Sequence, residues 1–323
     1  MDHPVADAFA DPASGEPPTD SASGARGPRP SGLGVWIAAA RPKTLWAAVA
    51  PVLVGVGLAL GEGAFHPLAA LCALAGAVFI QIGTNYVNDA EDAVKGADTE
   101  DRKGPMRAVA TGLVTPQAMR VAAGVAFALA VASGGYLIAR GGVEILILGL
   151  VCIASGVAYT AGKYALAYTG LADLFVLVFF GPVAVAGTYY VQALALPSWV
   201  PIAGIGPGAL ATAILLANNV RDVHEDRVAN KRTLVVRFGR EAGVKLYSFM
   251  ITVAVMVPAA MVWVSRGHLG ALAASLIASL AGRRLATTLA RNEDPAVLNP
   301  LLGKTALLLF VYSLAFALGW WLT

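Results

Sequence analysis

Two groups of asparagine and aspartate side chains in this sequence are spaced so that each group can share one face of a helix. The first group contains Asn85, Asn88, Asp89 and Asp92. A second group, spaced by three and four residues, contains Asn218, Asn219, Asp222 and Asp226. Residues separated by three, four or seven positions lie on the same side of an α-helix. Both groups follow a long hydrophobic run, so we interpret them as two halves of one site at a membrane surface.

Clustered carboxylates at a membrane edge favour a bound cation. Two unit charges about 4 Å apart repel each other by on the order of 4 kcal/mol at an effective dielectric constant of 20. Aspartate and asparagine offer only oxygen ligands, which suit Mg²⁺ rather than zinc. Mg²⁺ takes one or two carboxylates and keeps its other positions for water and phosphate oxygens. The pattern therefore predicts a diphosphate that is held to the acidic side chains through the metal ion.

Basic residues follow both acidic groups. Arg102, Lys103 and Arg107 come after the first group, and Lys231 and Arg232 come after the second. Cations beside a diphosphate stabilise the charge that it gains as a leaving group. A single acidic run at a helix end is more often a cap or a solvated turn. Two such runs, each on helical spacing and each followed by bases, instead favour a functional site.

The composition is that of an all-α polytopic membrane protein. Hydrophobic residues make up 57% of the chain and charged residues only 13%, whereas soluble proteins carry roughly 25% charged residues. The apolar runs approach the ~20 residues that cross a bilayer as a helix, and they lack the short alternating pattern of a transmembrane barrel. We therefore expect the lipid bilayer as a partner. The small net charge of +3 gives no indication of nucleic-acid binding, and we expect none.

The hydrophobic runs predict nine helical spans. Residues 1–34 are rich in Pro, Gly, Ala, Ser and Asp, so we expect a disordered tail and a single transmembrane domain over 35–323. The RPKTL stretch at 41–45 suggests an interfacial break in the first span. The predicted spans are 35–60, 65–88, 117–139, 143–160, 171–190, 200–220, 244–265, 268–288 and 301–322.

The distribution of positive charge predicts the orientation. With nine spans, the two ends of the chain face opposite sides of the membrane. Of the 23 Lys and Arg residues, all but Arg140 and Arg266 then fall on the side of the N-terminal tail and of both acidic groups. Because Lys and Arg favour the cytoplasmic side, we expect this side to be the cytoplasmic face of the plasma membrane. Spans two and six both end in an acidic group, which suggests two four-helix halves, a final span, and a pocket where the halves meet.

A third loop, Tyr159 to Asp173, has two interpretations. Tyrosines near a membrane interface are usually belt residues, and an aspartate at the start of a span can favour a helix N-terminus. The alternative is that the loop lies beside the pocket, where Lys163 or Tyr159 would orient a second substrate.

Two stretches resemble motifs of the UbiA superfamily of intramembrane prenyltransferases. They are NxxNDxxD at 85–92 and NNVRDVHEDRVANKRTLVVRFG at 218–239. The extensions GADTEDRKGPMR and NKRTLVVR are similar to the branch that prenylates 1,4-dihydroxy-2-naphthoate, and the resemblance covers about residues 35–323. It implies nine transmembrane helices around a central cavity, and Mg²⁺ that bridges both motifs to a prenyl diphosphate. The implied metal ligands are Asn85, Asp89, Asp92, Asp222 and Asp226.

The resemblance also implies a reaction, in which a polyprenyl group replaces the carboxyl group of 1,4-dihydroxy-2-naphthoate to give demethylmenaquinone. The residues expected to take part in catalysis are Asp89, Asp92, Asp222, Asp226 and Lys163. Those expected to bind the diphosphate and the acceptor are Asn85, Asn88, Arg102, Lys103, Arg107, Asn218, Lys231, Arg232 and Tyr159. One alternative is another acceptor, such as 4-hydroxybenzoate, from which no CO₂ is lost. A divalent-cation transporter is a further alternative, but it would place its acids near the middle of the spans.

Overall fold

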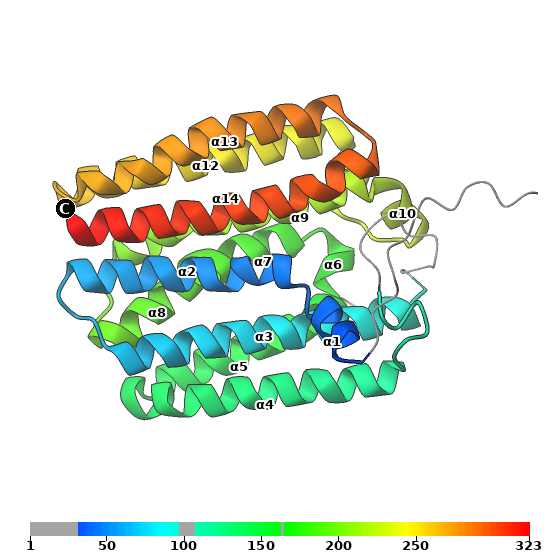
Figure 1. Ribbon diagram of the computed structural model, residues 1–323, viewed down its shortest axis with the longest axis horizontal. Helices are drawn as coiled ribbons and strands as arrows, with labels where there is room; N and C mark the ends of the chain where they lie inside the picture. Colours follow the sequence, from blue (N-terminus) through cyan, green and yellow to red (C-terminus); the bar gives the residue numbers. More distant parts are fainter. Residues whose placement is uncertain (1–31, 97–106, 163–164) are drawn as a thin grey trace, which may run out of the picture.

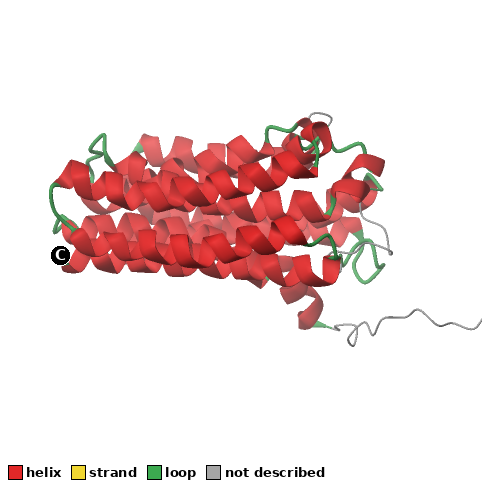
Figure 2. Ribbon diagram, turned by 90° about the horizontal axis from the view of Figure 1, so that it is seen from above, coloured by secondary structure: helices red, strands yellow, loops and turns green. Residues whose placement is uncertain are grey.

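The computed structural model describes residues 32–96, 107–162 and 165–323 (Figure 1). Every regular element in these residues is helical (Figure 2). The α-helices are α1 (Leu33–Ala40), α2 (Pro42–Gly61), α3 (Pro67–Val94), α4 (Pro116–Gly141), α5 (Val143–Thr160), α6 (Leu166–Thr169), α7 (Ala172–Val178), α8 (Ala184–Ala193), α9 (Val200–Arg221), α10 (Val223–Val228), α11 (Leu234–Phe238), α12 (Arg240–Ser265), α13 (Leu272–Arg291) and α14 (Pro295–Leu322). A π-helix η1 (Phe179–Val183) joins α7 to α8, and a 3₁₀ turn η2 (Leu269–Ala271) precedes α13.

Nine helical segments within these described ranges are long and apolar enough to cross a bilayer, which confirms the predicted all-α polytopic fold. The second span runs further than predicted, to Val94. The predicted first span is two helices, because the backbone of Arg41 turns into the left-handed region between α1 and α2, and this confirms the break expected at RPKTL. The predicted tail lies outside the described residues up to position 31, and α1 already begins at Leu33.

Prolines and polar caps fix where several spans begin. Pro42, Pro67, Pro116 and Pro295 each stand in the first turn of a helix, where the missing N–H costs no hydrogen bond. The Thr115 hydroxyl accepts the Ala118 N–H at 3.2 Å and so caps α4. Interior prolines also occur, as expected for spans whose neighbours can satisfy the freed backbone groups.

The fifth span is kinked and lies against α9. It runs from α7 through η1 to α8, and Gly181 inside η1 has non-helical dihedral angles (φ −120°, ψ −110°) next to Pro182. A Cβ on Gly181 would lie 2.6 Å from the Gly204 carbonyl oxygen, and one on Gly208 would lie 2.3 Å from that of Leu177. Glycine on both helices therefore lets the two backbones touch, and the kink keeps this span close to α9.

An apolar cavity of about 290 Å³ lies between the first four spans and the fifth. None of its lining residues in the described chain comes from the last four spans, whereas α9 lies in the main core with α12 and α14. Three lining side chains on α4 and α5 are also exposed on the outer surface of the bundle, Val131 (54%), Leu146 (40%) and Leu150 (57%). The cavity therefore reaches the lipid-facing surface.

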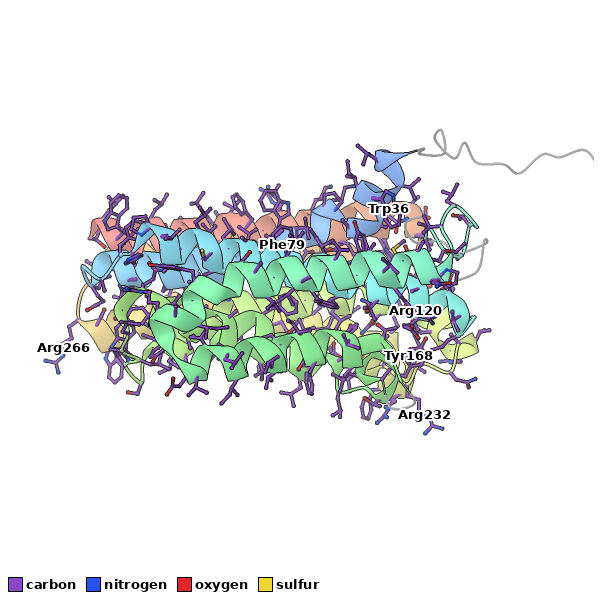
Figure 3. The ribbon with its side chains drawn as sticks, turned by 90° about the horizontal axis from the view of Figure 1, so that it is seen from below. Trp36, Phe79, Arg120, Tyr168, Arg232 and Arg266 are labelled. Atoms are coloured by element: carbon purple, nitrogen blue, oxygen red, sulfur yellow. The ribbon has the colours of Figure 1, made fainter. Side chains whose placement is uncertain are left out.

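The two ends of the bundle differ in what they carry. The short helices α6 and α10 lie at the same end as α1 and the last turn of α3, and the C-terminus lies at the other end (Figure 1). Arg120, Tyr168 and Arg232 are found at the α10 end, and Arg266 is at the opposite end (Figure 3).

Candidate active site

The first acidic group lies on the last two turns of α3. The helix continues past the apolar run to Val94, so the four residues share one helical face as predicted. All four are buried, with exposed fractions of 2% for Asn85, 8% for Asn88, 1% for Asp89 and 5% for Asp92. Buried carboxylates require hydrogen bonds or positive partners. Asp89 accepts backbone hydrogen bonds, and Asp92 contacts a hydroxyl and two cationic side chains.

The second acidic group spans a helix break. α9 ends at Arg221, Asp222 stands between the two helices (φ −95°, ψ 14°), and Asp226 belongs to α10. The Asp226 N–H still donates to the Asp222 carbonyl oxygen at 2.8 Å, so the helical step of four is kept. Asp222 and Asp226 are 3% and 8% exposed.

Asp89 holds the chain that follows the first motif. Its carboxylate accepts the backbone N–H of Ala108 at 3.1 Å and that of Val109 at 3.2 Å. Hydrogen bonds to an ionised carboxylate are stronger than neutral ones. This aspartate therefore fastens residues 107–114 to the end of α3.

Asp92 is where the two motifs meet. Its Oδ1 accepts the Tyr168 hydroxyl at 2.9 Å, and its Oδ2 lies 3.4 Å from the Lys231 Nζ and 3.7 Å from a guanidinium nitrogen of Arg107. Lys231 belongs to the second motif, because its backbone N–H donates to the Asp226 carbonyl oxygen at 2.8 Å. The predicted convergence of the acidic groups and the bases Arg107 and Lys231 is thus present in the fold.

Tyr168, on α6, was not predicted as a site residue. Lys95 Nζ lies 4.7 Å from the centre of its ring and Lys231 Nζ lies 5.1 Å from it, both within the range of a cation–π contact. Its hydroxyl bonds to Asp92 at the same time. The sequence offered only an interfacial tyrosine in an apolar loop, and it is the placement of α6 over the end of α3 that brings this side chain into the site.

Arg221 is the second residue that the sequence did not indicate. It donates to both Asp222 oxygens, at 2.5 and 2.6 Å, and also to the side-chain oxygens of Asn218 and Asn299 at 2.8 Å. Successive residues of a helix point about 100° apart, so helical spacing gives no reason to pair neighbours. The pair forms because the helix breaks at Asp222.

The other residues predicted for the site hold neighbouring helices together, lie on the surface, or fall outside the described residues. Asn85 donates to the Ala40 carbonyl oxygen at 2.8 Å, which ties α3 to the turn at Arg41. Asn88 accepts the Thr160 hydroxyl at the end of α5. The side chain of Arg232 is exposed and points outward (Figure 3). The remaining predicted residues, Arg102, Lys103 and Lys163, lie outside the described residues.

The apolar cavity ends at this acidic cluster. Tyr159 lines the cavity on the last turn of α5. Gln81 on α3 also lines the cavity, and its side-chain amide donates to Asn85 Oδ1 of the first motif at 3.4 Å. The arrangement thus combines a polar, charged mouth with an apolar interior, which suits a ligand that has an anionic head and a hydrocarbon tail.

The donor atoms at the cluster are those of a hard cation. Carboxylate and carboxamide oxygens dominate, and Mg²⁺ prefers such ligands. Among the described residues, no three His, Cys, Asp or Glu side chains are grouped as a metal site.

Comparison with known proteins identifies the class of this fold. Residues 48–314 match the UbiA prenyltransferase family. The chain is 39% identical over 284 residues to the 1,4-dihydroxy-2-naphthoate octaprenyltransferase of Mycobacterium tuberculosis, covering 87% of this chain and 95% of that protein. It is 38% identical over 298 residues to the enzyme of the same name from Escherichia coli, covering 88% and 94%. The chain belongs to the UbiA prenyltransferase family.

Solved structures agree with this fold. A UbiA homologue from Archaeoglobus fulgidus bound to GPP and Mg²⁺ matches with a TM-score of 0.61 at 17% identity, covering 88% of this chain and 99% of that one. The same homologue bound to Cd²⁺ matches with a TM-score of 0.63 at 15% identity, covering 87% and 98%. At this level of identity the likeness establishes the fold alone.

Proposed function

We propose that this protein transfers a polyprenyl group from polyprenyl diphosphate to 1,4-dihydroxy-2-naphthoate, with loss of CO₂ and diphosphate, to give the quinol form of demethylmenaquinone. The observation that carries the proposal is the meeting of both acidic motifs with Arg107, Lys231 and Tyr168 at the mouth of an apolar cavity. The choice of acceptor is supported by the two octaprenyltransferases that resemble this chain over most of both lengths.

The charged mouth holds the diphosphate head. We assign Asn85, Asp89, Asp92, Asp222 and Asp226 to Mg²⁺, which, when bound, would neutralise the diphosphate oxygens and favour departure of that group. Lys231 and Arg107 already stand beside Asp92 and supply further positive charge to the leaving group. When Asp222 binds Mg²⁺, the Arg221 guanidinium can move from this carboxylate to the diphosphate.

The cavity holds the hydrocarbon tail and protects the reacting carbon. Four aromatic rings line it, Tyr159, Phe175, Phe179 and Phe180, and two of them, Phe175 and Phe179, stack with their centres 5.4 Å apart. Aromatic faces attract a cation, so these rings stabilise the allylic cation that forms as diphosphate departs. The apolar lining also excludes the water that would capture this cation.

Charge placement supports the orientation that we propose. Arg120 and Arg232 lie at the site end and Arg266 at the opposite end (Figure 3), in keeping with the Lys and Arg bias of the loops. We therefore assign the site and the N-terminal tail to the cytoplasmic face of the plasma membrane.

The test is an assay of membranes that contain the protein, with labelled polyprenyl diphosphate and a panel of aromatic acids. We expect turnover of 1,4-dihydroxy-2-naphthoate with one CO₂ released for each diphosphate, and loss of turnover when Mg²⁺ is chelated. Prenylation of 4-hydroxybenzoate without CO₂ release would replace the proposed acceptor. Flux of divalent cations into vesicles, without prenyl transfer, would instead identify a transporter.

A further inference from the structure

Asp173 is a buried carboxylate that the fold leaves without a partner. It stands in the first turn of α7, is 5% exposed, and neither of its carboxylate oxygens has a hydrogen-bond partner among the described residues. An unpaired charge in such a place is costly, and native proteins seldom retain one without a reason. A helix cap does not explain this residue, because neither carboxylate oxygen accepts a hydrogen bond from the backbone at the start of α7.

The position of Asp173 points to a ligand. It lies one helical turn before Val176, which lines the apolar cavity. Phe175, which also follows Asp173 on α7, lines the cavity as well. Asp173 therefore stands on the helix that lines one side of the cavity, at its first turn, while Asp92 and Asp222 are engaged with Arg107, Lys231 and Arg221.

We propose that Asp173 binds the phenolic hydroxyl of the aromatic acceptor and accepts its proton during the reaction. This proposal rests on the proposed function, since it names the group that recognises the acceptor in the same site. A bare carboxylate repels a diphosphate but accepts a hydrogen bond from a neutral hydroxyl. The substrate hydroxyl thus supplies the hydrogen-bond donor that Asp173 lacks among the described residues.

The bonds that form and break in this reaction all belong to the two substrates. The ring carbon that bears the carboxylate forms a bond to the first carbon of the prenyl group, and the carbon–oxygen bond to diphosphate breaks with its electron pair on diphosphate. As the ring attacks, the neighbouring hydroxyl becomes a carbonyl and its proton passes to Asp173. The bond to the carboxylate then breaks, CO₂ leaves, and the electron pair restores the aromatic ring while the carbonyl oxygen takes the proton back from Asp173.

The experiment compares Asp173→Asn with the control Glu144→Gln, which changes an exposed carboxylate at the start of α5. We expect Asp173→Asn to lower turnover of 1,4-dihydroxy-2-naphthoate about 100-fold, the scale of general acid–base catalysis. Its melting temperature in detergent should stay the same or rise, because an unpaired charge is removed. Binding of polyprenyl diphosphate should be unchanged. Turnover within about threefold of wild type, or a lowered melting temperature alongside lost activity, would overturn the proposal.

A second measurement uses an acceptor whose hydroxyl beside the carboxyl-bearing carbon is methylated. The wild-type protein should favour the free hydroxyl over the methyl ether, and Asp173→Asn should lose that preference. If the variant keeps the full preference, Asp173 does not contact this hydroxyl. If the wild type prenylates a different phenol and not 1,4-dihydroxy-2-naphthoate, the proposed function fails, and the same comparison with that phenol and its methyl ether still decides the role of Asp173.

Discussion

The two acidic motifs of this protein are alike in sequence but are held in different ways. In the first, Asp89 is fixed by backbone N–H groups of Ala108 and Val109. In the second, Asp222 is paired with the side chain of its neighbour, Arg221. A backbone contact is part of the fold, whereas a long cationic side chain can change partners. From this difference we expect Asp89 to stay fixed in the site and Asp222 to change partners when a charged ligand binds.

The largest expected effect tests whether the two motifs nevertheless act on one ligand. Asp92→Asn and Asp222→Asn should each lower prenyl transfer about 10³-fold, which is typical of removing a group that stabilises charge in the transition state. Both losses should appear in the membrane assay at saturating Mg²⁺. The control is Glu241→Gln, an exposed carboxylate that pairs with Lys245 on the same helix, α12. A wild-type rate in either aspartate variant would remove that motif from the site.

An intermediate effect, on stability, is expected when Arg221, the cationic partner of Asp222, is replaced. Arg221→Gln removes the guanidinium that donates to both oxygens of the buried Asp222, which should destabilise the protein by about 3 kcal/mol in the absence of Mg²⁺. Added Mg²⁺ should recover much of this loss, because the ion can take the place of the guanidinium. Thermal unfolding in detergent, with and without Mg²⁺, measures the difference, and Arg291→Gln on an exposed position is the matched control. An equal loss of stability in both conditions would mean that the pair is fixed rather than exchangeable.

The smallest effect concerns the link between the motifs. Tyr168→Phe removes only the hydroxyl that donates to Asp92 and keeps the ring between the two lysines. A hydrogen bond to a charged group contributes about 1.5–3 kcal/mol, so KM for polyprenyl diphosphate should rise by about 10- to 100-fold. Tyr190→Phe removes a hydroxyl that bonds to the Gly141 carbonyl oxygen, far from the acidic cluster, and should leave KM unchanged. Equal values for the two variants would show that Tyr168 does not help to hold the site together.

Helical periodicity predicted most of the fold and the shared helical face of the first acidic group. Asn85 to Asp92 fall on one face because α3 remains helical beyond the apolar run, and the proline after Arg41 correctly indicated a break. Such features depend on neighbours in the sequence. They follow from local rules on side-chain spacing and on the missing N–H of proline.

The residues that were not predicted depend on the meeting of distant segments. Arg221 is adjacent to Asp222 in the chain, and only the helix break turns the two side chains toward each other. Tyr168 enters the site because α6 lies across the end of α3. Asp173 looked like an ordinary helix-start residue, and its unpaired carboxylate can be recognised only once every surrounding group is placed.

The exposed lining of the cavity has a consequence for which lipids the enzyme can use. Val131, Leu146 and Leu150 border both the cavity and the surrounding bilayer. The end of a long prenyl chain can therefore extend from the cavity into the lipid. Only the first isoprene units then need to fit inside the protein. The length of the prenyl chain on the quinone would then be set by the synthase that makes the polyprenyl diphosphate. This protein would transfer chains of different lengths.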